Sequence, residues 1–276
     1  MKKIIKVGSL SLLIGLFLSL VGWKMNGFQS MTIDQHYLPR IVKIEKKTTN
    51  LSSFTSIKGD INNYNVHIKT GKNYKIHYQG QSQANPIYRI KNNQLIIKQT
   101  GKLYNAVVHK SYVPNVLTIT VPKNSNLNQL DWKITGDNLT LEHLNIKQVK
   151  LRIKNGYFWA YNSTLGQTDF NSFGKFAGNV SLHQVKLLNG ASFKQEGAFR
   201  MFGGSFKGIV KIYNSGYFNH LYGLSKKDGY TLKTGSSDAY NNWYGFKTTK
   251  TITKNPHSKN QIELYNKYFE NVVDHQ

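Results

Sequence analysis

The chain has 276 residues, with 37 basic and 13 acidic side chains and a formal net charge of +24. It contains no cysteine, which excludes disulfides, thiolate metal sites, a cysteine nucleophile and a lipid-modified N-terminal cysteine. Aromatic residues make up 13% of the chain, which is too many for a disordered polycation, so we expect a folded body.

The N-terminal segment has the layout of a membrane anchor. Three lysines lie among residues 1–6, and an apolar run broken only by Gly and Ser occupies residues 7–23. Its length fits a membrane span of about 17–25 residues. No alanine occurs before Ala84, so a small-residue cleavage site is missing and we favour an uncleaved signal anchor over a cleaved signal peptide. The positive-inside bias predicts residues 1–6 in the cytoplasm, a transmembrane segment at 7–23 and the remainder outside the cell.

After a polar tether at residues 24–40, the body at 41–276 is predicted to be all-β. Short alternating runs rich in β-branched and aromatic residues dominate it, bounded by Gly, Asn and Pro. The clearest of these runs are 66–68, 74–78, 95–97 and 116–121. Asn92 and Asn93 mark a hairpin turn, and Pro122 is expected to end a strand.

Beyond Pro122, glycines recur at intervals of about 20 residues, the period of a repeat architecture, and are followed by apolar alternation. They are Gly136, Gly156, Gly178, Gly197, Gly216 and Gly235. Because a unit of about 20 residues cannot bury its own apolar face, this period predicts a β-solenoid of stacked rungs at about 133–240. The glycines would occupy the corners of the rungs. An antiparallel β-sandwich with regular turns is the alternative.

The C-terminal stretch is predicted to close the open end of the solenoid. Its apolar residues fit one face of a helix or a closing strand: Ile262, Tyr265, Phe269, Val272 and Val273. Either element would cap the exposed edges of the last rung.

Together these features resemble the bacterial "putative adhesin" family of β-strand-repeat proteins of unknown function. The resemblance covers roughly residues 50–265 and is carried by the membrane segment, the opening units at 65–76 and 93–97, and the strand Leu117–Lys123 that leads into the glycine rungs. Thr234-Gly235-Ser236-Ser237 with Tyr244-Gly245 completes it. The resemblance implies a membrane-anchored envelope protein of a Gram-positive bacterium, of a kind sometimes encoded beside cell-envelope stress systems. It implies no catalytic residues, and residues 265–276 depart from the usual glycine-punctuated final strand.

Motifs for catalysis and for cofactors or metals are absent from the sequence. No phosphate-binding loop, nucleophile elbow or H-E-x-x-H occurs, and the nine histidines lack ligand spacing. Asp131, Asp137 and Asp169 are the only carboxylates that suggest acid–base work, and their offsets from the repeat glycines do not match. We therefore predict a non-catalytic protein without cofactor or metal, with a β-helical polysaccharide-active enzyme as an alternative.

Five lysines precede repeat glycines by two or three residues, namely Lys133, Lys154, Lys175, Lys194 and Lys233. Stacked on successive rungs about 5 Å apart, they would form a basic ridge whose self-repulsion a bound polyanion relieves. Tyr157 and Tyr217 each follow a glycine and would offer flat surfaces for sugars. The alternative is that lysine simply marks the solvent face of each strand.

The charge points to an anionic partner outside the cell. Lysine, a hydrated point charge, greatly outnumbers arginine, which favours diffuse and salt-sensitive attraction. We expect teichoic acid or an anionic membrane surface as the partner, and the outward topology argues against nucleic acid. The leading hypothesis is a membrane-anchored extracellular protein that binds anionic envelope polymer or acts in adhesion. An accessory role in the envelope stress response is a further alternative.

Overall fold

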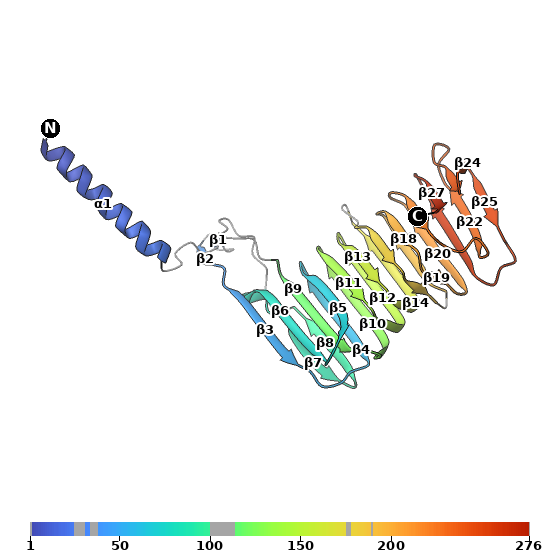
Figure 1. Cartoon of the computed structure of the whole chain (residues 1–276), viewed down its shortest axis with the longest axis horizontal. Coiled ribbons are helices and arrows are strands. Elements are labelled where there is room, and N and C mark those ends of the chain that lie inside the picture. The colour runs from blue at the N-terminus through green and yellow to red at the C-terminus, as the bar shows by residue number, and fades with distance from the viewer. Residues whose placement is uncertain are drawn as a thin grey trace.

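The computed structural model describes residues 2–24, 31–33, 38–99, 114–174, 178–188 and 190–275. The N-terminal segment forms α1 (Lys2–Lys24), which projects away from the β body (Figure 1). Residues 7–24 have a mean hydropathy of 1.7, and none of this stretch is buried against the rest of the chain. The helix is therefore long and apolar enough to cross a membrane.

The body is built from two long, open, mainly parallel sheets. Sheet I has 13 strands, in spatial order β25 (Thr251–Lys254), β22 (Gly229–Thr234), β26 (Gln261–Asn266), β20 (Ile209–Asn214), β17 (Ser192–Gln195), β14 (Thr164–Phe173), β12 (Asn145–Lys154), β10 (Asn126–Thr135), β4 (Ser56–Asn62), β8 (Gln94–Lys98) and β7 (Ile87–Lys91), with β16 (Lys186–Leu187) and β19 (Ser205–Phe206) beside this path. Sheet II has 12 strands, in spatial order β24 (Phe246–Thr248), β23 (Asn241–Trp243), β27 (Asn271–Asp274), β21 (Asn219–Tyr222), β18 (Phe199–Phe202), β15 (Val180–His183), β13 (Tyr157–Tyr161), β11 (Asn138–Glu142), β5 (Asn65–Gly71), β9 (Val116–Pro122), β6 (Lys75–Gln81) and β3 (Ile44–Asn50). The predicted tether contributes to a short antiparallel pair, β1 (Met31–Ile33) and β2 (Pro39–Ile41), and a 3-10 turn lies at Ser82–Ala84.

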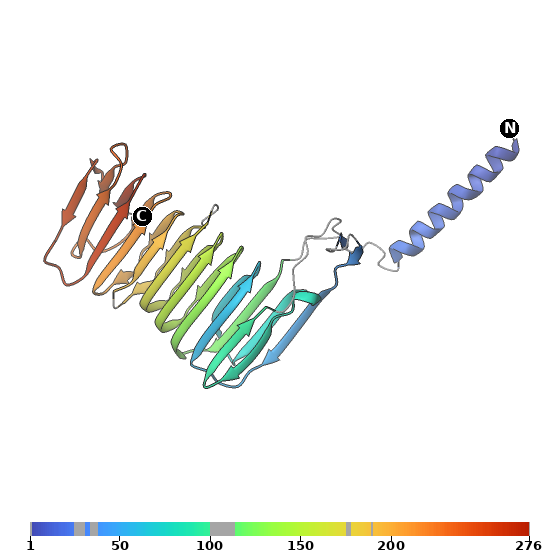
Figure 2. The same cartoon turned by 180° about the vertical axis from the view of Figure 1, so that it is seen from behind.

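Successive rungs stack as the glycine period predicts. Along the repeat the chain alternates between sheet I and sheet II, and the rungs follow one another along the body (Figures 1 and 2). Two of these rungs give sheet I two short strands each, β16 with β17 and β19 with β20. Leu127 pairs in parallel with Ile146, which pairs with Leu165, so equivalent positions recur once per rung. The β-solenoid prediction is confirmed. The antiparallel sandwich does not describe these rungs, because their strands pair in parallel.

Aromatic side chains fill the space between the two sheets. Phe158, Phe170, Phe193 and Phe199 are at most 1% exposed, and their ring centroids are 5.2–5.5 Å apart from one neighbour to the next. The neighbouring rungs bury these rings, because a single rung alone cannot cover its own apolar side chains. The core is therefore shared between rungs rather than contained in any one of them.

All six predicted glycines lie at one corner of the solenoid, in the turns that lead from a sheet I strand to a sheet II strand. The rungs touch there through backbone. A Cβ at Gly178 would lie 1.6 Å from the carbonyl oxygen of Gly156, and a Cβ at Gly216 would lie 1.5 Å from that of Glu196. A side chain at either position would force the rungs apart, so the corner requires glycine.

The C-terminal prediction is wrong in one respect. Residues 261–274 do form strands, β26 and β27, but these lie between β20 and β22 and between β21 and β23. The last segment of the chain is thus an internal rung, and the distal cap consists of the antiparallel strands β25 and β24. Lysines at positions 247 and 254 on these edge strands discourage pairing with another chain.

A buried asparagine ladder joins the distal rungs. Asn219, Asn271 and Asn241 are fully buried neighbours in sheet II. The Nδ2 of Asn219 donates to Oδ1 of Asn271 over 2.8 Å, and Asn271 donates likewise to Asn241 over 2.8 Å. These bonds satisfy amides that would otherwise be costly to bury.

Candidate functional site

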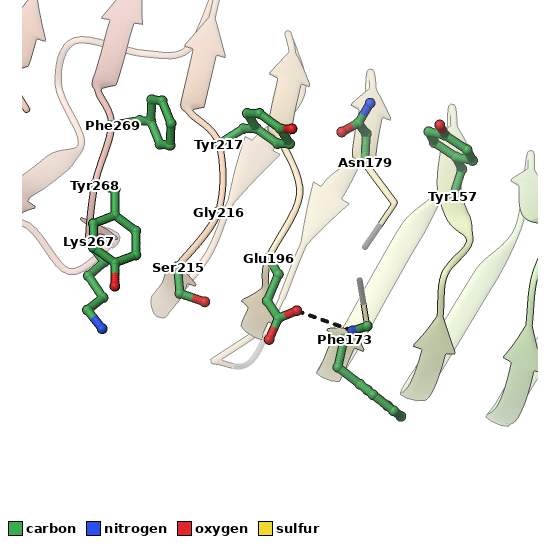
Figure 3. Close-up of a pocket in the computed structure, with 11 residues that line it drawn as sticks. Tyr157, Phe173, Asn179, Glu196, Ser215, Gly216, Tyr217, Lys267, Tyr268 and Phe269 are labelled. Atoms are coloured by element: carbon green, nitrogen blue, oxygen red, sulfur yellow. Dashed lines mark hydrogen bonds between the residues drawn. The ribbon is translucent and has the colours of Figure 1, made fainter. Parts of the chain in front are cut away.

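The glycine corner forms an open groove of about 1100 Å³ that crosses several rungs (Figure 3). Two glycines of the turns, Gly174 and Gly216, line the groove between side chains that project from either side. Its sheet I lip includes Phe173, Glu196, Ser215 and Lys267. Its sheet II lip includes aromatic and amide side chains, namely Tyr157, Asn179, Tyr217 and Phe269.

Both tyrosines that the sequence proposes for sugar stacking line this groove. Tyr157 is 44% exposed and Tyr217 58% exposed, and Figure 3 shows them on the same side of the corner. Tyr217 packs beside Phe269, with ring centroids 5.8 Å apart. The groove thus presents several partly exposed aromatic rings, the arrangement that packs against the C–H faces of a sugar.

Charged groups at the groove have opposite signs. Lys267 lies 4.8 Å above the ring of Tyr268, and its hydrogen bond with the Tyr268 hydroxyl raises the pKa of the lysine, so the amine stays charged. The carboxylate of Glu196 accepts a hydrogen bond of 3.2 Å from the backbone N–H of Gly174. That contact holds the acidic side chain at the sheet I lip.

The four predicted ridge lysines that the structure describes do not stack as neighbours. Lys133, Lys194 and Lys233 share one outward column of sheet I, but other side chains stand between them: Arg152, Asn171, Tyr213 and Tyr265. Lys154 lies two positions nearer the corner and pairs with Phe173 of the groove lip. Lys175 lies outside the described residues. The glycines occupy different positions within their turns. Lysines at the same distance in sequence from a glycine therefore do not pair with one another across the strands.

A neighbouring column alternates in charge and contains two of the three aspartates. In order along sheet I it runs Lys58, Asp131, Lys150, Asp169, Ser192, Lys211 and Glu263. Lys150 separates Asp131 from Asp169, which also binds Arg152 through a 2.7 Å contact. Asp137 lies at the corner, where burial raises the pKa of its carboxyl. Asp131 and Asp169 therefore lie among basic side chains and Asp137 lies at the corner, so the three do not form one acidic cluster.

An aromatic ladder on the outer face of sheet II was not predicted from the sequence. Tyr161, His183, Phe202 and Tyr222 stack on successive rungs, with centroids 5.0, 4.7 and 5.2 Å apart and ring planes within 20°. Trp159 stacks on Tyr157 at 5.8 Å, so an aromatic surface continues from the groove toward this ladder. The sequence could have indicated this ladder, because its planar side chains recur at the same spacing as the corner glycines.

Two histidines of this face sit in environments that disfavour charge. Burial lowers the pKa of His183 and of His220, and at His220 this effect outweighs the opposing hydrogen bond with Glu270. Nε2 of His220 lies 3.1 Å from Glu270, and Nδ1 lies 2.9 Å from the Tyr222 hydroxyl, contacts that hold the ring in place. The imidazoles therefore act as neutral stacking rings near neutral pH.

We expect stability to fall as the pH is lowered from about 7.5 to about 5.5, because the unfolded histidines take up protons at higher pH than the folded ones. His183→Phe keeps a planar ring in the ladder and removes one titrating group. Its melting temperature should therefore fall less over this range than that of the wild type. Thermal unfolding at each pH provides the measurement, and identical pH slopes would contradict the assignment.

One known protein family matches most of the folded body. A family model described as Toastrack DUF4097 matches residues 54–239, more than half of the chain. The chain belongs to the Toastrack DUF4097 family. The Toastrack match begins just before β4, ends just before β23 and includes all six corner glycines. No curated protein matches the chain.

Several solved structures resemble this Toastrack chain at low identity. A "putative cell adhesion protein" from Clostridium sporogenes is 12% identical over 85% of this chain and 100% of that one, with a TM-score of 0.39. A "putative adhesin" from Bacteroides fragilis is 11% identical over 85% and 97%, with a TM-score of 0.35. Another from Parabacteroides merdae is 9% identical over 85% and 96%, with a TM-score of 0.33.

Proposed function

We propose that this Toastrack protein is a membrane-anchored, extracellular and non-catalytic binding protein that holds anionic cell-envelope polymer in its corner groove. The observation that carries the proposal is the groove itself, which brings Tyr157, Tyr217 and Phe269 together at one corner with Lys267. Teichoic acid has the required chemistry, since it is a phosphate polymer decorated with sugars. An adhesive role follows if the bound polymer belongs to another surface.

The net charge and the aromatic rings have different roles in the proposed binding. The net charge of +24 attracts a polyanion over long range, and the attraction weakens with salt. Lys154, in register with Phe173 of the groove lip, and Lys267 supply positive charge beside the rings. The rings then select sugar-bearing polymer over simple polyanions, because stacking requires an apolar ring face.

Anchoring through α1 supports the location. None of residues 7–24 is buried, so the apolar side chains of this stretch have no partner within the described chain. A bilayer provides that partner. The lysines at the start of the helix favour an orientation that leaves the solenoid outside.

The test measures binding of the full chain, in detergent or nanodiscs, to purified teichoic acid at increasing salt. We expect affinity to fall steeply with salt. Tyr157→Ala/Tyr217→Ala should weaken binding roughly 30-fold at low salt, since each stacked ring contributes about 1 kcal/mol. Phe246→Ala is the matched control, because this aromatic is 64% exposed but lies on edge strand β24. Salt-independent binding, no binding at low salt or an unaffected double variant would contradict the proposal.

The enzyme alternative finds little support in the geometry. Asp131 and Asp169 alternate with lysines, and no group of three or more potential metal-binding side chains occurs among the described residues. The accessory role in envelope stress rests on the family resemblance and remains a prediction.

A further inference from the structure

Positive charge is concentrated in the rungs nearest to the helix. Residues 43–99 contain ten basic and two acidic side chains, whereas residues 114–275 contain 20 basic and ten acidic ones. Basic side chains thus outnumber acidic ones five to one in the first segment and two to one in the second. The more basic end lies beside α1 in both views of the molecule (Figures 1 and 2).

An amphipathic surface lies on the outer face of this end. We call it the β7 patch and define it as Ile87, Arg89, Lys91, Ile96 and Lys98. Ile87 pairs with Lys98 and Arg89 pairs with Ile96 across the antiparallel strands β7 and β8, so these side chains project on the same side of sheet I. Ile87 is 59% exposed.

The β7 patch contains a shallow, mainly apolar hollow between basic groups. The hollow has a volume of about 240 Å³ and is lined by Ile87, Tyr88, Arg89, Ile96 and Lys98. Asp60 pairs in register with Lys98, but its carboxylate contacts Lys133 at 4.0 Å. The exposed Ile87 and the half-buried Ile96, flanked by cationic side chains, fit the boundary of an anionic bilayer. There apolar side chains enter the headgroup layer and cations contact lipid phosphates.

The chain between helix and solenoid permits this contact. Residues 25–43 separate α1 from β3, and a segment of this length reaches at most about 65 Å when extended. A patch held this close to the bilayer meets lipid at high effective concentration, so a weak interaction becomes populated.

We infer that the β7 patch docks the first rungs onto anionic phospholipid of the bilayer that α1 spans. The solenoid then stands at a fixed angle, with the corner groove and distal rungs directed away from the lipid. This inference rests on the anchored topology proposed above. In this arrangement the basic surface nearest the helix binds the membrane, and the corner groove binds the polymer.

The absence of cysteine allows a direct test with single-cysteine variants. The full chain carrying Ile87→Cys is labelled with an environment-sensitive dye and placed in nanodiscs of phosphatidylcholine, with or without added phosphatidylglycerol. Phe246→Cys is the matched control, since that position is also well exposed but lies at the distal end. We expect quenching by brominated lipid at position 87 only, in phosphatidylglycerol nanodiscs only, and reversal at high salt.

Charge variants separate docking at the β7 patch from general attraction. We expect quenching at position 87 to fall at least fivefold in the triple variant Arg89→Gln/Lys91→Gln/Lys98→Gln. The control triple variant removes the same charge at the distal end and should leave this quenching unchanged. It is Lys247→Gln/Lys250→Gln/Lys254→Gln. Equal quenching in both lipids, equal effects of the two triple variants or no quenching at position 87 would overturn the inference. Teichoic acid binding by the same proteins reports on the groove independently. Failure to enter nanodiscs would contradict the anchored topology and the docking together.

Discussion

Phe193→Ala is expected to lower the free energy of unfolding by about 3–5 kcal/mol. The Phe193 side chain is fully buried, and its ring centroid lies 5.5 Å from that of Phe170 and 5.2 Å from that of Phe199. Its removal leaves a cavity shared by neighbouring rungs, and parallel strands hydrogen-bonded on both sides cannot collapse to fill it. Denaturant unfolding followed by circular dichroism measures the loss.

The control for this prediction is Phe246→Ala, whose aromatic ring is exposed on an edge strand. Its effect should stay within about 0.5 kcal/mol, because surface substitutions away from packed features rarely cost more. If the two variants unfold at the same denaturant concentration, the core is not shared between rungs in the way the stacked rings indicate.

Gly216→Val should destabilise the solenoid by about 3 kcal/mol or more, at the upper end of what overpacking costs. A Cβ at this position meets the carbonyl oxygen of Glu196 at 1.5 Å, and that oxygen belongs to the backbone of the preceding rung. Backbone cannot rotate away as a side chain can, so the two rungs must separate. Thermal and denaturant unfolding of the purified variant provide the measurement.

Ser215→Ala is the matched control at the same corner, since Ser215 is the adjacent residue and is exposed. We expect its stability to equal that of the wild type within about 0.5 kcal/mol. A Gly216→Val chain as stable as Ser215→Ala would show that the rungs do not touch at the corner. The requirement for glycine would then fail.

Sequence periodicity was sufficient to predict the solenoid because burial repeats with the rung. Phe158 and Ala160 follow Gly156, and similar apolar alternation follows most of the other glycines, so the inward faces were visible in the sequence. Local alternation of apolar residues likewise predicted the strands at 66–68 and 95–97. It also predicted the turn at Asn92 and Asn93, two residues that have positive φ angles.

Features that local patterns did not reveal depend on contacts between distant rungs. β26 enters between β20 and β22 although it follows β22 and β25 in the chain, and no local pattern encodes such an insertion. Asn219, Asn241 and Asn271 resemble turn residues in the sequence, yet their amides bond one another inside the core. Polar residues can be assigned to a core only when their partners are known.

The candidate site was predictable in part for the same reason. Tyr157 and Tyr217 reach one groove because each follows a corner glycine, and that rule survives small shifts in register. The lysine ridge needs exact register, and small differences at the corner place Lys154 and Lys133 in different columns. The sequence thus predicts which residues lie at the same corner more reliably than which residues lie in the same column of a sheet.

Hydrogen exchange of the full chain in nanodiscs, with and without teichoic acid, tests the central claim most directly. We predict slower exchange on polymer binding at the corner, in the turns around residues 214–218 and 266–270, with little change in the distal strands β24 and β25. Protection confined to the distal strands, or no protection at saturating polymer, would contradict a binding site in the corner groove.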